Sequence, residues 1–418
     1  MALSKKPVTG MKDIMPAEMQ IRDYLIALIK ETYGQFGFLP IETPCVEHIE
    51  NLSNKQGGEN EKLIFKILKR GEKLKLDAIQ TEDDLVDSGL RYDLTVPLVR
   101  YYSNHAAELP MPFKALQIGS VWRADRPQKG RFRQFYQCDI DILGEPSNLA
   151  EIELIMATGT LLGKVGFKGF TVRINDRRIL KAMAAYSGFA EDSYDTVFII
   201  LDKMDKIGID GVAAELKDSG FEAESVARYL ELFHGMESAA DSIAYLAHTL
   251  EGVLEADAET HLQEIMTSVK ATCDAGFHII FDPTLVRGMS YYTGTIFEIE
   301  MEEFGSSVAG GGRYDKMIGK FTGNDISACG FSIGFERIVT ILLDQGFQIP
   351  NSRQKKAFLI EKGISNEMLC QIMSQAQCER QEGIQVLVTR MNKNKKYQKE
   401  QLTGEGYTEF LEFYKEAR

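Results

Sequence analysis

The sequence predicts an α+β fold: an antiparallel sheet domain interrupted by a helical insertion, followed by a small α/β unit. Several strand-like runs follow one another without an intervening helix, which favours antiparallel pairing over a doubly wound parallel sheet. A mostly helical, acidic stretch then separates these runs from further strands, and strand and helix alternate again near the C-terminus. At about 150 residues per domain, the 418 residues suffice for about two to four domains.

The first element is a helix, because Pro16 suits a first helical turn and Ile21, Leu25, Leu28 and Tyr33 recur at helical spacing. A second helix is expected at 149–162. The strands of the sheet domain are expected at 38–43, 90–96, 113–122, 135–143, 277–282, 291–300 and 328–333. The last unit is expected to contain a strand at 357–361, a helix at 366–381, a strand at 384–389 and a lysine-rich helical end.

These elements predict the domain boundaries. The sheet domain takes residues 1–175 and 277–345, and the helical insertion takes residues 176–276. The C-terminal unit takes residues 353–418. It is short, with two clear strands in its sequence.

Composition excludes some classes of protein. The 48 Lys and Arg against 61 Asp and Glu give a net charge of −13, which argues against a general DNA coat but allows one local basic surface. The six cysteines form no C-x-x-C pair, and such scattered cysteines suit a reducing compartment. No apolar run approaches the roughly 20 residues of a membrane span. We therefore expect a soluble, cytoplasmic protein.

Polar side chains alternate along two of the predicted strands. Gln137, Asp139 and Asp141 share one face, and Arg91, Asp93 and Thr95 share another. A solvated outer face would explain one such strand. Because buried carboxylates need partners, several of them in an apolar sheet favour a polar ligand pocket instead.

Arginines and glycines gather in three further segments. A basic hairpin has a loop that can meet phosphates, although a lone basic hairpin is more often a solvated loop. Because Arg123 lies within the strand, where an unpaired guanidinium would be costly, we expect it to have an anionic ligand or a carboxylate partner. Gly310–Gly312 allow a close backbone approach to a ligand, or a tight hairpin. Arg337 lies at the start of a predicted helix, where a cation needs a compensating anion, either a structural carboxylate or a nucleotide phosphate. No Walker loop occurs, so phosphate binding would rely on arginines rather than on a glycine-rich loop. No H-x-x-x-H pair occurs either, so we expect no metal held by protein His or Cys.

Several motifs in the sequence resemble those of a known family. The chain resembles the histidyl-tRNA synthetases, which are class II aminoacyl-tRNA synthetases, over nearly its whole length and most strongly from Gly10 to Leu343. The class II motifs are matched by GFLPIETPCVEHIEN (37–51), WRADRPQKGRFRQFYQ (122–137) and GFSIGFERI (330–338). The histidine-specific peptides are matched by LVRGMSYYTG (285–294) and AGGGRYD (309–315), and the N-terminal signature by GMKDIMP (10–16).

The resemblance implies an activity and its participants. The enzyme would activate L-histidine with ATP and Mg²⁺ to histidyl-adenylate and pyrophosphate, then transfer histidine to the 3′-terminal adenosine of its tRNA. It would do so as a homodimer built around the first class II motif.

The resemblance also implies roles for individual residues. Arg123 would bind the α-phosphate and the histidine carboxylate, Arg131 the outer phosphates and Arg337 the ATP tail. Arg287 would stabilise the charge that develops on the α-phosphate. Histidine would be held by Asp93, Thr95, Gln137, Asp141, Arg287, Tyr291, Tyr292 and Tyr314. The loop with Arg126, Gln128 and Lys129 would lie toward the tRNA acceptor end.

The chain departs from the family pattern at Ser290, where an aspartate commonly precedes the paired tyrosines, and in its short C-terminal unit. Two other functions compete. The regulatory subunit of ATP phosphoribosyltransferase, a relative that binds histidine without chemistry, would lose some of the arginines that are present here. A purely structural dimeric module would leave the polar strand faces and the arginine-bearing loops unexplained.

Overall fold

A computed structural model describes residues 3–53, 60–74, 80–126, 132–272, 276–287, 291–301, 306–350 and 353–415. The chain divides into two compact units. The first combines Met1–Ile14 with Arg22–Leu342, and the second combines Met15–Ile21 with Leu343–Arg418. Each unit has a sheet of its own.

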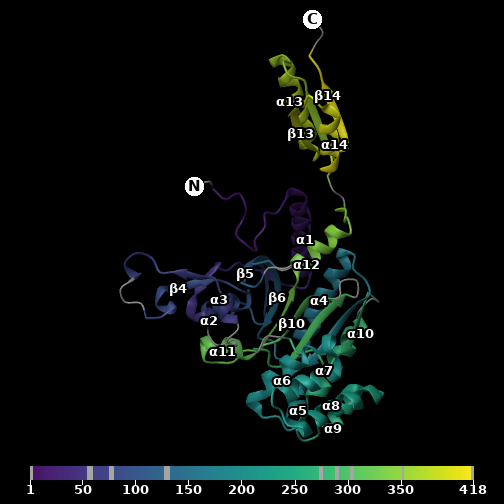
Figure 1. Ribbon diagram of the computed structural model, residues 1–418. Coiled ribbons are helices and arrows are strands. Elements are labelled where there is room, and N and C mark those ends of the chain that lie inside the picture. The colour runs from purple at the N-terminus through teal and green to yellow at the C-terminus, as the bar shows by residue number, and fades with distance from the viewer. Residues whose placement is uncertain are drawn as a thin grey trace. The chain divides into compact units, whose positions relative to one another are not determined.

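The first unit is built on an eight-stranded sheet with the order β1-β5-β6-β11-β10-β9-β7-β8 (Figure 1). Its central pairings are antiparallel, and only the edge pairs β1–β5 and β7–β8 are parallel. The predicted antiparallel-dominated sheet is therefore confirmed. The strands are β1 Leu39–Pro40, β5 Phe113–Trp122, β6 Gln134–Leu143, β7 Phe170–Asp176, β8 Phe277–Phe281, β9 Thr295–Met301, β10 Ser306–Arg313 and β11 Ala328–Ile333.

Three long helices supply much of the apolar core of this unit. Helix α1 (Pro16–Gln35) buries Leu25, Ile29 and Tyr33 completely, as its helical spacing predicts. Helix α4 (Leu149–Val165) packs against β11, and α10 (Ala258–Thr272) packs against α4, β7 and β8. Helix α12 (Phe335–Asp344) follows β11 directly.

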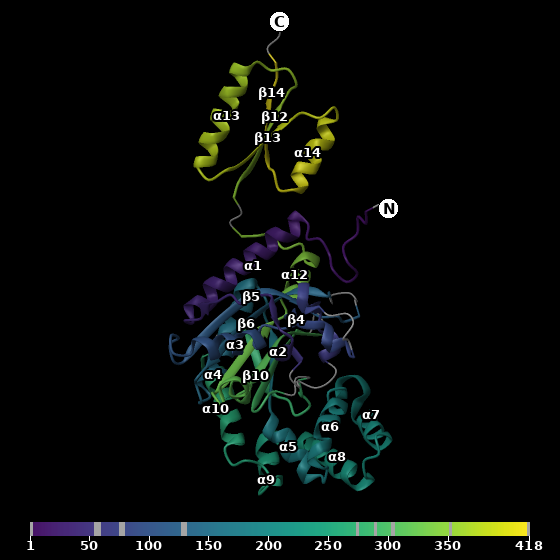
Figure 2. The same cartoon turned by 90° about the vertical axis from the view of Figure 1, so that its left-hand side faces the viewer.

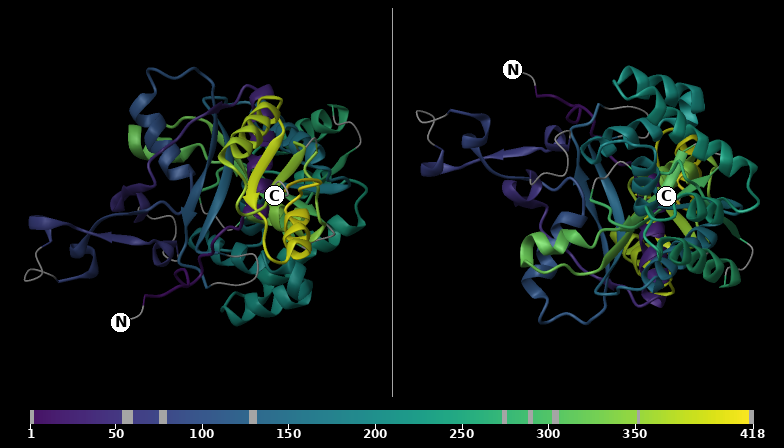
Figure 3. Two further views of the ribbon diagram at one scale, coloured as in Figure 1. Left: turned by 90° about the horizontal axis from the view of Figure 1, so that it is seen from above. Right: turned by 90° about the horizontal axis from the view of Figure 1, so that it is seen from below.

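The predicted strand at 90–96 is wrong. Strand β4 (Val86–Leu90) ends where the prediction begins, and helix α3 (Thr95–His105) starts before it would end. β4 belongs to a separate small sheet with β2 (Val46–His48) and β3 (Lys66–Leu68). This small sheet extends away from the large one in both views of Figure 3. Two other strands are shorter than predicted, β1 being only Leu39–Pro40 and β9 beginning at Thr295.

The predicted helical stretch contains α5 (Arg177–Tyr186), α6 (Tyr194–Leu201), α7 (Met204–Asp218), α8 (Ala223–Ser238) and α9 (Ser242–Thr249), followed by α10. Helices α5 to α9 gather at one end of the first unit (Figures 1 and 2). α10 instead returns to the large sheet. The remaining short elements of this unit are α2 (Ile49–Ser53), α11 (Lys316–Thr322) and the 3₁₀ turns Asn60–Leu63, Gly71–Lys73, Glu82–Leu85 and Glu191–Ser193.

The second unit has a parallel three-stranded sheet with the order β13-β12-β14. Alternate residues of β12 (Lys355–Ile360) face different helices: Phe358 packs with α13 (Asn366–Gln381), and Leu359 packs with α14 (Lys395–Gly404). The expectation of two strands is corrected, because β14 (Glu409–Phe413) pairs with β12 on the side opposite β13 (Gln385–Arg390). No helix in the described residues is long and apolar enough to cross a membrane.

Candidate active site

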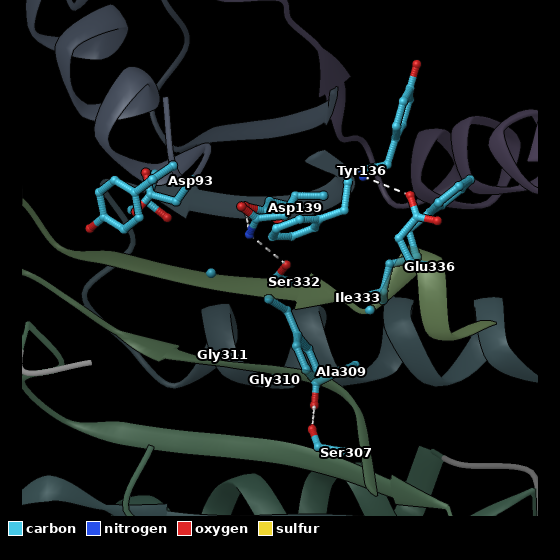
Figure 4. A pocket seen from close by; sticks show the side chains of 18 of the residues that line it. Asp93, Tyr136, Asp139, Ser307, Ala309, Gly310, Gly311, Ser332, Ile333 and Glu336 are labelled. Atoms are coloured by element: carbon cyan, nitrogen blue, oxygen red, sulfur yellow. Dashed lines mark hydrogen bonds between the residues drawn. The ribbon is translucent and has the colours of Figure 1, made fainter. Parts of the chain in front are cut away.

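One face of the large sheet forms the floor of a cavity of about 450 Å³ (Figure 4). Its walls come from β6, β10, β11, the start of α12, the segment before α3 and the segment before β9. The predicted site residues that line it are Asp93, Thr95, Arg123, Gln137, Asp141, Arg287, Tyr291, Tyr292, Tyr314 and Arg337. Residues from positions 93 to 337 therefore converge on one place.

Four of the predicted site residues, and Ser290, are not among the described residues that line the cavity. Arg126 is exposed and is not among the residues that line the cavity. Gln128, Lys129, Arg131 and Ser290 lie outside the described residues.

Asp93 and Thr95 reach the cavity by a route that the sequence pattern did not predict. Instead of alternating on a strand, they lie at the start of α3, where the backbone N–H of Val96 donates to Asp93 Oδ1 at 3.0 Å. Arg91 does not join them in the cavity. Its guanidinium donates to the carbonyls of Thr43 and Ser120 at 2.7 and 2.9 Å, so its role is to brace the backbone.

Three buried carboxylates line the cavity. Asp93, Asp139 and Asp141 are 2%, 5% and 3% exposed, and each has one oxygen without a hydrogen-bond partner among the described residues. Asp93 and Asp139 enter from different elements (Figure 4). Burial raises the pKa of all three groups, that of Asp139 to about 7, because a desolvated carboxylate is disfavoured. The site is therefore prepared for a cation, which would restore the lost solvation.

Aromatic and amide groups surround these carboxylates. The Tyr314 hydroxyl donates to Asp141 Oδ1 at 2.5 Å, and its ring lies 6.0 Å from that of Tyr291. The Tyr291 and Tyr292 rings are 4.8 Å apart. The Gln137 amide donates to Asp139 and to Ser332, both at 3.4 Å, while its Oε1 has no partner among the described residues. Together they form a buried polar wall that suits a small ring with hydrogen-bonding nitrogens.

Arginines line the same cavity, and Arg123 lies near enough to Asp93 and Asp139 to favour their charged forms. Arg123 Nε donates to the carbonyl of Tyr92 at 2.9 Å, and its guanidinium lies 5.2 Å from the centre of the Phe135 ring. Arg337 donates to the carbonyl of Ser307. These contacts fix the guanidinium groups in the wall of the cavity, which is the geometry needed for binding phosphate or carboxylate.

Arg287 has the most unusual backbone of the described residues. It is the only non-glycine residue among them with a left-handed φ, 59°, a conformation that costs free energy and is concentrated at functional sites. Its guanidinium donates to Glu298 at 2.6 Å, and its Nε, which is buried, has no hydrogen-bond partner among the described residues. Arg287 is thus held on one side and retains buried donor capacity on the other.

The glycines at 310–312 lie within β10 and not in a hairpin turn. A Cβ on Gly310 would lie 2.3 Å from an Arg287 guanidinium nitrogen, and one on Gly311 would lie 1.9 Å from the Gly330 carbonyl. Gly310 therefore makes room for Arg287, and Gly311 permits close packing of β10 on β11. Both also line the cavity.

Sequence reasoning missed several residues of the cavity wall. The sequence pattern puts Asp139 on the polar face of its strand but assigns it no role. In the structure Asp139 lines the cavity and is almost as deeply buried as Asp141. Tyr136, Phe335 and Glu336 also line the cavity. The alternation in β6 could have identified Asp139, whereas nothing local in the sequence marks Glu336, whose ionic partner is 314 residues away.

The cavity therefore suits a ligand that carries both positive and negative charge. The carboxylates suit an ammonium group, and the arginines suit carboxylate and phosphate. Among the described residues that line it, no side chain is arranged as an activated serine or cysteine nucleophile. What it offers is a place where two anions can be brought together and developing charge stabilised.

Comparisons with known proteins agree with this geometry. Residues 10–338 match the family model described as histidyl-tRNA synthetase. The histidine–tRNA ligase of Leifsonia xyli is 47% identical over 352 residues, which cover 82% of this chain and 81% of the relative. That of Christiangramia forsetii is 39% identical over 354 residues, covering 81% and 76%.

Solved structures share the fold. A histidyl-tRNA synthetase from Nostoc superposes with a TM-score of 0.78 at 26% identity, covering 96% of this chain and 90% of the other. A Bacillus halodurans protein described as an ATP phosphoribosyltransferase regulatory subunit/histidyl-tRNA synthetase also has a TM-score of 0.78, at 20% identity and with full coverage of both chains. The second similarity concerns the fold alone.

Proposed function

The chain belongs to the histidyl-tRNA synthetase family, and from this membership we propose that it activates histidine with ATP and transfers the histidyl group to tRNA. The observation that carries the proposal is that one cavity is lined both by three buried carboxylates and by Arg123, Arg287 and Arg337. An amino acid has an ammonium group for the first and a carboxylate for the second, and ATP brings phosphates to the same arginines.

In the first step, a histidine carboxylate oxygen attacks the α-phosphorus of ATP. A new oxygen–phosphorus bond forms, the bond to the β-phosphate oxygen breaks, and pyrophosphate leaves with the electron pair. The protein supplies no nucleophile. Its arginines reduce the repulsion between the two anions and meet the charge that grows on the α-phosphate.

We assign Arg123 to the α-phosphate and the histidine carboxylate, and Arg337 to the distal part of ATP, as the resemblance implies. Arg287 takes the developing charge, because its unpaired buried Nε and its fixed backbone make it a preorganised donor. Arg131 is assigned to the outer phosphates by the resemblance alone, since it lies outside the described residues.

Histidine would lie between the carboxylates and the tyrosines. Asp93, Thr95, Gln137 and Asp141 would hold its α-amino group, and Tyr291, Tyr292 and Tyr314 would close around the imidazole. The partnerless oxygens of Asp93 and Asp141 and of the Gln137 amide support this placement. When an ammonium group binds there, it compensates the charges that burial otherwise disfavours.

ATP would enter with Mg²⁺, which neutralises charge on the phosphates when it is bound. The described residues contain no group of three or more His, Cys, Asp or Glu side chains placed to hold a metal ion. In nucleotide enzymes Mg²⁺ usually keeps several waters and binds through one or two carboxylates and the substrate phosphates.

The tRNA would meet both units. The loop with Arg126, Gln128 and Lys129 would face its acceptor end. In the second unit, Lys395 and Lys399 each pair with Glu412, whereas Lys393 and Lys396 are exposed. We assign the exposed pair to phosphate contact, since a lysine already paired with a carboxylate has less charge to offer.

Three further features are proposals. The chain would form a homodimer through the segment 38–51, whose Val46 is exposed in the single chain. Residues 1–175 with 277–345 would form the catalytic domain, 176–276 a helical insertion, and 353–418 an anticodon-binding domain. The protein would act in the cytoplasm.

The experiment that tests the function is ATP–pyrophosphate exchange with and without histidine. The competing regulatory subunit would bind histidine without exchange, and a structural module would do neither. The retention of Arg123, Arg287 and Arg337 in one cavity favours the enzyme over both.

A further inference from the structure

Arg22 lies in α1, outside every segment that carries the family's motifs for substrate binding. It is 4% exposed, and its guanidinium binds Glu336 through two parallel hydrogen bonds of 2.7 and 2.9 Å. Both side chains of this ion pair are almost completely buried. A bidentate pair of this kind fixes the position and the orientation of both groups.

Glu336 joins this ion pair to the wall of the cavity. It lies in the first turn of α12, where a carboxylate interacts favourably with the helix dipole, and it immediately precedes Arg337. The same oxygen that accepts from Arg22 also accepts the backbone N–H of Tyr136 at 3.0 Å (Figure 4). One carboxylate therefore connects α12 with β6, and both elements line the cavity.

The flat faces of the Arg22 guanidinium add a second connection. It lies 4.9 Å from the centre of the Tyr136 ring and 5.0 Å from that of Phe335, and these two rings are 5.6 Å apart. Charged guanidinium groups are attracted to aromatic faces at such distances. Arg22 thus contacts the Tyr136 and Phe335 rings as well as Glu336, the residue that immediately precedes Arg337.

We propose that Arg22 is a positioning residue for ATP, acting through Glu336 to hold the start of α12 and the backbone of Tyr136 in place. This inference rests on the proposed function, because it takes Arg337 as part of the nucleotide site. Without Arg22, Glu336 keeps a buried negative charge with its ionic partner removed. The carboxylate then moves toward water or toward Arg337, and the nucleotide wall shifts with it.

The test compares Arg22→Met with Arg178→Met in ATP–pyrophosphate exchange. Arg178 is a matched control, because it makes a bidentate pair of 3.0 and 2.8 Å with the fully buried Asp176 and does not line the cavity. For Arg22→Met we expect the KM for ATP to rise on the order of tenfold, below the ~100-fold that a 1 Å misplacement can cost. The KM for histidine should change less than about threefold.

Melting temperatures measured in parallel separate positioning from stability. Both variants should melt lower than the parent, and only Arg22→Met should raise the KM for ATP. Arg22→Lys should recover only part of the ATP affinity, because one ammonium cannot make the paired bonds. If Arg22 acts only through Glu336, the Arg22→Met/Glu336→Gln double variant should be no worse for ATP than Glu336→Gln alone.

An unchanged KM for ATP in folded Arg22→Met would overturn the proposal. So would equal increases in the KM values for ATP and histidine, or the same increase for ATP in Arg178→Met. Failure of the proposed function would look different, since the parent protein itself would then show no histidine-dependent exchange.

Discussion

Replacing Arg287 with alanine tests the residue on which the proposed chemistry depends most. The side chain is 24% exposed and is held by Glu298 at 2.6 Å, with Gly310 leaving the space that its guanidinium fills. Alanine removes the donors and leaves the left-handed backbone in place. The expected result is a folded protein in which the α-phosphate has lost a fixed positive charge.

The size of the effect follows from what Arg287 contributes in the transition state. Loss of one preorganised donor to a developing anion costs about 100- to 1,000-fold in rate, or about 2.7 to 4 kcal/mol. Because Arg287 is already paired with Glu298, part of its charge is offset before substrate binds. We therefore expect the lower end, about 100-fold in the adenylation rate, with smaller changes in histidine and ATP binding.

Single-turnover formation of histidyl-adenylate measures this rate directly. Arg287→Lys should recover little, since an ammonium cannot reproduce the guanidinium fork. Gly310→Ala should slow the same step without changing Arg287 itself, because its Cβ would lie 2.3 Å from the guanidinium. Gly163→Ala is the matched control, since a Cβ there meets nothing within 4 Å in helix α4. A folded Arg287→Ala protein with a near-normal rate would remove this residue from the mechanism.

Three other predictions follow from the same structure. Burial raises the pKa of Asp139 from 3.8 to about 7, so the folded state keeps a proton that the unfolded state releases, and this group lowers stability as pH rises from about 4 to about 7. Asp139→Asn should therefore melt higher than the parent protein at pH 8, with a smaller difference at pH 5; a pH-independent difference would refute the assignment. Deleting all residues after Asn351 should leave histidine-dependent exchange largely intact in a folded protein while aminoacylation falls, and equal loss of both would show that the role of this unit is misplaced. Analytical ultracentrifugation should show a dimer at micromolar concentration, and a monomer alone would count against the proposed interface at 38–51.

The elements that the sequence predicted well are those with long, regular patterns. The helix over α1, the strands β5, β6 and β11 and the helix α13 were confirmed nearly to the residue. In each, apolar side chains repeat over several turns or alternate along the whole strand, and tertiary packing agrees with the local pattern.

The failures have physical causes. The alternation from Leu90 to Val96 covers too few residues to distinguish a strand from a turn that enters a helix, and Asp93 accepts the Val96 N–H at that helix start. β14 was not predicted, because glutamates interrupt both of its faces and neither face is purely apolar in sequence. In the structure its residues are all half-buried. The small sheet of β2, β3 and β4 consists of strands too short to leave a periodic signal.

The residues of the candidate site were likewise predicted only in part. Its arginines and tyrosines were found because they stand in contiguous peptides that resemble family motifs. The left-handed backbone of Arg287 and the pairing of Glu336 with Arg22 depend on segments brought together by folding. No local pattern could have revealed them.

Histidine-dependent ATP–pyrophosphate exchange by the purified chain, without tRNA, tests the central claim most directly. We expect exchange that requires histidine, is not supported by other amino acids and is strongly reduced in Arg287→Ala. A folded protein that binds histidine but shows no exchange would contradict it and would favour a regulatory role for the same pocket.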